Sequence, residues 1–211
     1  MIFMVGPHNS GKTTVAKGMV NCGFFHIETG DIVRQKYNEV APGISFHDWV
    51  RKNNAENIYF FDNFILDAIN SVKERSINGE KRLHGIVVTG NRQLDGIKYL
   101  MERASDSDNR RNIIIYLDAS IEELYSRQLK RKDKIIPNLT FTSFKNEYLA
   151  FDEEMGLERI KDVADFILDS GKPADEIFKE VSLTLKEEGY DLEIKNQLIL
   201  ESKFDCEKKI K

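Results

Sequence analysis

The feature that most constrains the fold is a glycine-rich segment near the start of the chain, Gly6-Pro-His-Asn-Ser-Gly-Lys-Thr13. It matches the pattern G-x-x-x-x-G-K-[ST] at every fixed position, and the apolar run Ile2–Val5 comes directly before it. Its glycines let the chain curl so that backbone N–H groups face inward, and a following helix adds partial positive charge at its N-terminus. The segment therefore predicts a phosphate-binding loop between a strand and a helix.

The polar side chains of this loop suit a bound triphosphate. Lys12 is a mobile charge that can follow the β- and γ-phosphates, and Thr13 offers a hydroxyl ligand to Mg²⁺. We therefore predict ATP and Mg²⁺ as cofactors. The residues expected to bind the nucleotide are Gly6, Pro7, His8, Asn9, Ser10, Gly11, Lys12, Thr13 and Thr14.

Five short apolar runs alternate with longer segments that have helical spacing. The runs are Ile2–Val5, Phe24–Ile27, Ile86–Val88, Ile113–Leu117 and Phe166–Leu168. Continuous apolar runs of this length are typical of strands covered on both faces. Because strand–helix alternation favours right-handed crossovers, we predict an α/β fold with a doubly wound parallel five-stranded sheet. Its ligands should bind at the carboxyl ends of the strands.

The segment between the second and third runs is too long for one crossover. Phe46, Trp49 and Val50 indicate a short helix, and Ile58–Val72 indicates a longer one. We expect a helical acceptor-binding insertion over about 31–80. Trp49 fits core packing better than the alternative of stacking on a base.

Two polar clusters follow the second and third strands, at the edge where a ligand is expected. Each contains an arginine that can pair with a phosphate through its forked guanidinium. Taken alone, the first cluster also fits a helix N-cap. The ligand-binding candidates in these clusters, to which the resemblance described below assigns the acceptor, are Thr29, Gly30, Asp31, Arg34, Gly90 and Arg92.

The segment from Arg127 to Lys134 has five basic residues and one acidic residue, in a chain of net charge −4. Arg127 and Arg131 are four residues apart and so share one helix face. Two interpretations remain open from the residues alone. The cations stabilise a helix C-terminus, or they form a clamp on a transferring phosphoryl group.

Composition and charge narrow the class of protein. A net negative charge disfavours general nucleic-acid binding, and apolar runs of five residues at most disfavour a membrane span. Cys22 and Cys206 do not form a disulfide framework, and no secretory signal is evident. We therefore expect a cytoplasmic protein with reduced thiols. The sequence does not indicate an oligomeric state.

In the order and spacing of its clusters, the chain from Met1 to about Glu188 resembles the P-loop kinases of small molecules, namely nucleoside monophosphate kinases and dephospho-coenzyme A kinase. Thr29–Arg34 resembles their T-G-D-x-x-R acceptor segment, and Thr89–Arg92 resembles their D-G-x-R turn. Ala164–Gly171 is similar to their A-D-x-x-I-x-N-x-G strand and loop.

The resemblance implies roles for further residues. Arg127 and Arg131 correspond to the arginines that open a lid, here expected over about 127–155. The loop beside the adenine would contain Gly171, Lys172 and Pro173. The resulting domain covers residues 1–188, and residues 189–211 form a tail of unknown role.

One departure from the family concerns the metal. Thr89 stands where the family has an aspartate that holds the Mg²⁺ water shell. We expect Asp31 or Asp118 to substitute, or Thr13 and the phosphates to hold the metal alone. The short lid contains no cysteine quartet, which excludes a zinc lid.

The predicted function is ATP-dependent phosphoryl transfer to a small-molecule acceptor, with a nucleoside monophosphate as the first choice. Catalysis is assigned to Lys12, Arg92, Arg127, Arg131 and Asp31, with Asp31 as the base if the acceptor is a hydroxyl. One alternative is phosphorylation of a sugar hydroxyl, as in dephospho-coenzyme A kinase. Another is a nucleotide-binding switch or NTPase without transferase activity.

Overall fold

The computed structural model describes residues 1–40, 43–78, 83–104, 111–132 and 135–190. Cys206 and the rest of the predicted tail after Tyr190, together with Lys134 of the basic run, lie outside the described residues. No helix among the described residues is long and apolar enough to cross a membrane.

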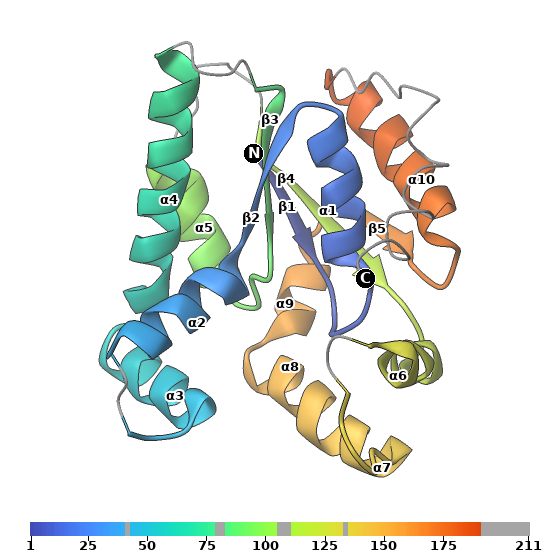
Figure 1. The fold of residues 1–211 in the computed structure, drawn as a ribbon. Helices are drawn as coiled ribbons and strands as arrows, with labels where there is room; N and C mark the ends of the chain where they lie inside the picture. The colour runs from blue at the N-terminus through green and yellow to red at the C-terminus, as the bar shows by residue number, and fades with distance from the viewer. Residues whose placement is uncertain (41–42, 79–82, 105–110, 133–134, 191–211) are drawn as a thin grey trace, which may run out of the picture.

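A parallel sheet of five strands forms the centre of the molecule (Figure 1). Each predicted apolar run lies within one strand, and the strand order is β2-β3-β1-β4-β5. The predicted fold class is therefore confirmed. The strands are β1 (Ile2–Val5), β2 (Phe24–Glu28), β3 (Gly85–Thr89), β4 (Ile113–Asp118) and β5 (Phe166–Asp169).

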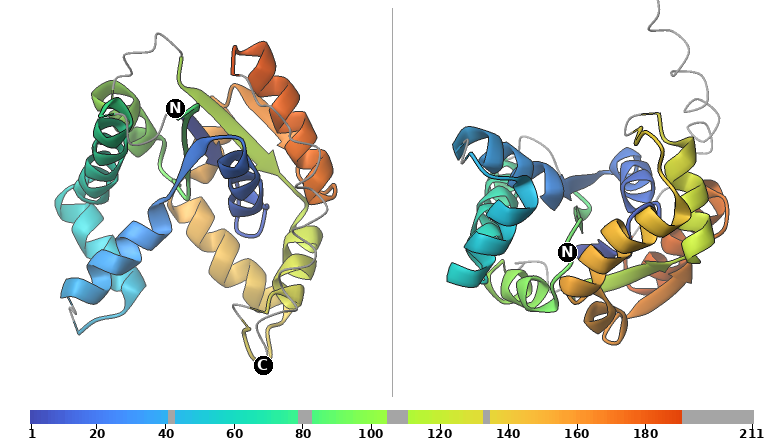
Figure 2. Two further views of the ribbon diagram at one scale, coloured as in Figure 1. Left: turned by 45° about the horizontal axis from the view of Figure 1, so that its top comes forward. Right: turned by 90° about the horizontal axis from the view of Figure 1, so that it is seen from below.

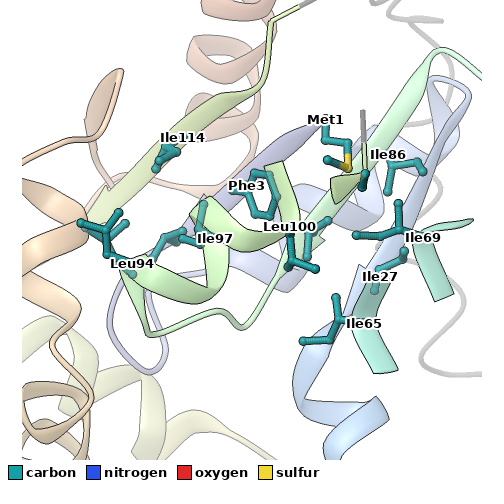
Figure 3. Packing of buried hydrophobic residues seen from close by; sticks show 14 of the residues in the cluster. Met1, Phe3, Ile27, Ile65, Ile69, Ile86, Leu94, Ile97, Leu100 and Ile114 are labelled. Carbon is teal, nitrogen blue, oxygen red and sulfur yellow. The ribbon is translucent and has the colours of Figure 1, made fainter. Parts of the chain in front are cut away.

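Helices cover both faces of the sheet because alternate strand residues point to opposite sides. Ile2 and Met4 of β1 pack in one buried cluster with α1 (Lys12–Asn21) and α10 (Ala174–Glu187). Phe3, its neighbour in the strand, packs in the opposite cluster, part of which Figure 3 shows. The helices on that second face are α4 (Phe60–Ile77), α5 (Leu94–Arg103) and α9 (Leu157–Lys161).

The expected helical insertion consists of α2 (Thr29–Val40), α3 (Phe46–Glu56) and α4. It has a small aromatic core of its own, in which Trp49 is 5% exposed and its ring centroid lies 5.0 Å from that of Phe61. Trp49 thus packs in this core, which is the role that the sequence favours.

The segment after β4 supplies the helices at the other side of the same sheet end (Figures 1 and 2). It contains α6 (Ile121–Lys130), α7 (Phe141–Phe144), the π-helical turn η1 (Lys145–Leu149) and α8 (Ala150–Glu154). Helix α6 begins with a capping box in which Ser120 and Glu123 satisfy each other's backbone N–H groups. The carboxyl ends of the strands are therefore flanked by the insertion on one side and by α6–α8 on the other.

Tyr190 extends the packed core beyond the last helix. Its side chain is buried, its ring centroid lies 5.9 Å from that of Phe24, and its hydroxyl donates to the backbone oxygen of Arg111 at 3.3 Å. The fold thus includes a residue that the predicted domain boundary at 188 leaves in the tail.

We predict that Tyr190→Ala lowers the free energy of unfolding by about 3 kcal/mol or more, because it leaves a cavity of aromatic size. Tyr190→Phe should cost only about 1 kcal/mol, since it removes one hydrogen bond and keeps the ring. Chemical denaturation of both variants measures the difference. An Ala variant as stable as the wild type would contradict the placement of Tyr190 in the core.

Candidate functional site

The phosphate-binding loop has backbone conformations that explain its glycines. Gly6 has φ 142° and Gly11 has φ 91°, in the region that favours glycine. A Cβ atom on Gly6 would lie 2.3 Å from the backbone oxygen of Leu117 at the end of β4, so a side chain there is sterically excluded. The loop therefore takes its tight curl directly against the sheet.

Lys12 folds back over this loop. Its Nζ donates to the backbone oxygens of Gly6 at 2.9 Å and Pro7 at 2.7 Å, and to Ser10 Oγ at 3.2 Å. Burial, reinforced by the nearby positive charge of Arg92, lowers the pKa of Lys12 to about 7. An anion bound beside Lys12 would relieve this crowding of positive charge.

A cavity of about 610 Å³ lies beside the loop and the start of α1. It brings together residues from both predicted parts of the nucleotide site. From the loop and α1 these are Asn9, Gly11, Lys12, Thr13 and Thr14, and from the segment after β5 they are Lys172 and Pro173. Gly171 lies next to them, and its backbone N–H donates to Asp169 Oδ1 at 2.8 Å. We call this the nucleotide cavity.

Arg127 in α6 and Arg131 at the C-terminal end of this helix both contact the phosphate-binding loop, through different groups. Arg127 donates to the backbone oxygen of Asn9 at 3.2 Å and to that of Ser170, so it ties the loop to the end of β5. Arg131 donates to Asn9 Oδ1 at 3.0 Å. Arg131 also lines a second cavity. Of these two cavities, Arg127 lines only the nucleotide cavity.

This second cavity has a volume of about 390 Å³ and lies between the insertion and α6–α8. We call it the acceptor cavity. Five of the six predicted acceptor residues line it, namely Thr29, Gly30, Arg34, Gly90 and Arg92.

The sixth predicted acceptor residue, Asp31, is not brought to this cavity. Its side chain is 77% exposed and pairs with Arg34 at 3.1 Å. It lines a neighbouring hollow, whose wall also includes Thr13 and Glu28. Asp118, the other carboxylate considered for the metal, instead pairs with Lys161 at 2.9 Å.

Glu28, at the end of β2, is the carboxylate that the structure places between the two cavities. Its Oε2 accepts hydrogen bonds from Thr13 Oγ1 at 2.9 Å and from Thr89 Oγ1 at 2.8 Å. Burial alone would raise the pKa of Glu28. The hydrogen bonds from Thr89 and Thr13 and the charge of Lys12 outweigh burial and lower this pKa below its usual value. Glu28 is therefore ionised at neutral pH.

Neighbouring residues make room for this carboxylate and orient its partners. Gly90 has φ 95°, and a Cβ atom there would lie 2.4 Å from Glu28 Oε1 and 2.5 Å from Thr29 Oγ1. His26 Nε2 lies 2.7 Å from Thr89 Oγ1, whose only hydrogen points at Glu28, so His26 donates. Thr89, the departure from the family pattern, thus serves as a hydrogen-bond donor to Glu28.

A second carboxylate that sequence reasoning missed, Asp152 of α8, joins the expected lid segment to the phosphate-binding loop. It is 3% exposed and forms an ion pair with Arg92. Its Oδ2 accepts from the backbone N–H of His8 at 3.0 Å and lies 3.2 Å from His8 Nδ1. His8 Nε2 lies 3.0 Å from Arg92 Nη2. We call His8, Arg92 and Asp152 the lid cluster.

The sequence contains a signal for Glu28 but not for Asp152. Glu28 is an acidic residue that directly follows the apolar run Phe24–Ile27 and directly precedes Thr29 and Gly30, at the expected carboxyl end of a strand. Asp152 lies in a short acidic segment, and its contacts with residues 60 and 144 positions away depend on the folded chain.

The geometry defines an α/β domain with a P-loop and two adjoining cavities, and solved structures share its fold. A sugar kinase from Janibacter sp. HTCC2649 has 17% identity and a TM-score of 0.54, over 88% of this chain and 93% of that one. A shikimate kinase from Bacteroides thetaiotaomicron has 14% identity and a TM-score of 0.56, over 88% of this chain and 97% of that kinase. A gluconokinase from Sinorhizobium meliloti 1021 has 19% identity and a TM-score of 0.55, over 88% of this chain and 91% of that kinase. The resemblance to the P-loop kinases of small molecules is confirmed at the level of the fold.

A family model described as AAA domain matches residues 5–137. Because this match covers more than half of the chain, the chain belongs to that family. No curated protein sequence matches the chain.

We predict that Asp152→Asn lowers the free energy of unfolding by about 3 kcal/mol, because it leaves the buried charge of Arg92 without its partner. Glu154→Gln is the matched control on the same helix. Glu154 pairs with Arg51 at 2.9 Å on the surface, and losing that pair should cost about 1 kcal/mol at most. Urea denaturation compares the two variants, and equal losses would contradict a structural role for the lid cluster.

Proposed function

We propose that this chain transfers the γ-phosphoryl group of Mg²⁺-ATP to a small anionic acceptor. The nucleotide cavity would hold ATP, and the acceptor cavity would hold the second substrate. The two volumes, about 610 and 390 Å³, lie within the range of roughly 300–1,000 Å³ that is usual for small-molecule sites.

The observation that carries this proposal is the polar junction between the cavities. Arg131 lines both cavities. Glu28 lines the acceptor cavity while it is hydrogen-bonded to Thr13, which lines the nucleotide cavity. A donor phosphate and an acceptor would therefore meet beside an arginine, a lysine and a carboxylate. Phosphoryl transfer needs this arrangement because its catalysis rests on positioning and charge stabilisation.

Thr13 and Glu28 have the chemistry that Mg²⁺ requires, namely hard oxygen donors beside the phosphate site. The hydroxyl hydrogen of Thr13 points at Glu28, so its lone pairs stay available to a cation. Bound with ATP, Mg²⁺ would neutralise charge on the β- and γ-phosphate oxygens. We assign Thr13 as the protein ligand and Glu28 as the carboxylate that orients it, in place of Asp31.

An anionic group on the acceptor is favoured by the arginines of the acceptor cavity, whose wall also includes the carboxylates of Glu28, Asp62 and Glu147. Arg34, Arg92 and Arg131 line it, and Arg92 is held in place by the lid cluster. In the transfer step, Lys12 would exchange its loop oxygens for phosphate oxygens, and Arg131 would neutralise the group in transit. The aromatic side chains of the insertion and α8 would help to exclude water, which suppresses hydrolysis.

A nucleoside monophosphate is our first candidate for the acceptor, because its phosphate suits these arginines and needs no base. The second candidate is an anionic polyhydroxy compound phosphorylated on a hydroxyl. It is favoured by Glu28, an ionised carboxylate on the wall of the acceptor cavity that is placed to take a proton. The fold is also that of proteins described as sugar, shikimate and glucono kinases.

The test is phosphoryl transfer from radiolabelled ATP to a panel of nucleoside monophosphates, gluconate, shikimate and pantetheine compounds. We expect transfer to members of one class, and Lys12→Ala should lower its rate at least about 100-fold, because it removes a charge that tracks the phosphoryl group. Lys179→Ala, at an exposed position of α10, is the control and should leave the rate unchanged. Hydrolysis of ATP that depends on Lys12, with no acceptor labelled, would contradict the proposal and favour an NTPase or switch.

A further inference from the structure

Asp62 is a buried carboxylate on the wall of the acceptor cavity. It lies in the first turn of α4 and is 7% exposed. Among the described residues, nothing donates a hydrogen bond to it or forms an ion pair with it. Burial raises its pKa to about 6, and no neighbouring charge contributes to the shift. Buried carboxylates are ordinarily paired, because desolvating an unpaired one is costly.

The fold keeps a specific space for this carboxylate. It lies against Gly96 of α5, where a Cβ atom would come 2.7 Å from Oδ1 and 2.8 Å from Oδ2. Any side chain at position 96 would have to displace Asp62. Both residues lie in the first turn of their helices, where backbone N–H groups provide partial positive charge. Asp62 is therefore held in place between two helix starts, with the acceptor cavity beside it.

The cavity has separate regions of opposite character. Arg92 is acted on electrostatically by Glu28 and Arg34, which line the same cavity, and Glu28 is hydrogen-bonded to Thr13 of the nucleotide cavity. The pKa shift of Asp62 comes from burial, without a contribution from any charged side chain in the described part of the chain, and Asp62 lines the cavity together with the apolar side chains of Phe61 and Ile65. The cavity thus offers cations in one region and an unpaired hydrogen-bond acceptor in another.

We propose that Asp62 is a specificity-determining residue that accepts hydrogen bonds from paired N–H or O–H donors of the acceptor substrate. The substrate would be bipolar, with its anionic group at the arginines and its donors at Asp62. The inference rests on the proposed function for the identity of this cavity. The donor pair has two possible sources, the amino and ring N–H edge of a nucleobase or the hydroxyls of a polyhydroxy acid.

The experiment measures dissociation constants by calorimetry for matched probes in wild type and Asp62→Asn. Guanosine monophosphate is compared with inosine monophosphate, which lacks one amino group, and gluconate is compared with hexanoate, which lacks the hydroxyls. In one of these pairs the wild type should bind the donor-bearing probe at least about tenfold more tightly, as expected for hydrogen bonds to a charged group. Asp62→Asn should remove most of that ratio and leave the affinity for ATP unchanged.

A stability measurement separates this role from a structural one. Because Asp62→Asn removes an unpaired buried charge, its Tm should equal or exceed that of the wild type. Asp67→Asn, at an exposed position of the same helix, is the matched control and should change neither Tm nor the probe ratio. A lowered Tm for Asp62→Asn with an unchanged probe ratio would overturn the proposal.

The remaining outcomes distinguish this inference from the proposed function. A wild type that prefers the donor-bearing probe in neither pair overturns the role of Asp62, even if ATP-dependent phosphorylation of some acceptor is observed. Donor-dependent binding that Asp62→Asn abolishes supports the role of Asp62, even if no probe is phosphorylated and the transferase proposal fails.

Discussion

The hydrogen bonds to Glu28 are the interaction on which the rest of the site depends. One carboxylate oxygen accepts from Thr13 of α1 and from Thr89 of β3, so three segments distant in sequence are fixed at one point. Gly90 lacks the side chain that would block this approach. Ionised and hydrogen-bonded, Glu28 places negative charge next to Lys12. Thr89, which stands where the family pattern has an aspartate, donates a hydrogen bond to this carboxylate on the adjacent strand.

Around this point the fold gathers cations that would repel one another without anions. Lys12, Arg92 and Arg131 are close enough for the two arginines to lower the pKa of the lysine. Glu28 offsets part of this repulsion, and Asp152 of the lid offsets another part through Arg92. Bound phosphate groups would offset the remaining repulsion between these cations, because their negative charge would lie next to the positive charges. Asp152 thereby connects α8 to Arg92 through a buried ion pair, and to the phosphate-binding loop through the backbone N–H of His8.

The sequence was sufficient to predict those parts of the structure that follow from a local pattern of residues. The five strands, the phosphate-binding loop and the capping box at Ser120 are local features, and each is where the pattern predicts it. The roles of Glu28, Asp62 and Asp152 depend on contacts between distant segments, and in sequence these residues resemble ordinary strand-end or helix-surface acids. Asp31 shows the converse. Its motif indicated a site residue, but in the first turn of α2 its carboxylate is exposed to solvent and pairs with Arg34.

The central claim, that Glu28 is the carboxylate of the transfer centre, is tested most directly by the turnover rate with saturating Mg²⁺-ATP and acceptor for Glu28→Gln beside Asp31→Asn. Because Gln keeps the shape and loses the charge, we expect Glu28→Gln to lower the rate at least about 100-fold. Asp31→Asn should stay within about threefold of the wild type. A Glu28→Gln enzyme that retains full turnover, with Asp31→Asn inactive, would contradict the account and return the catalytic carboxylate to the position that the motif suggested.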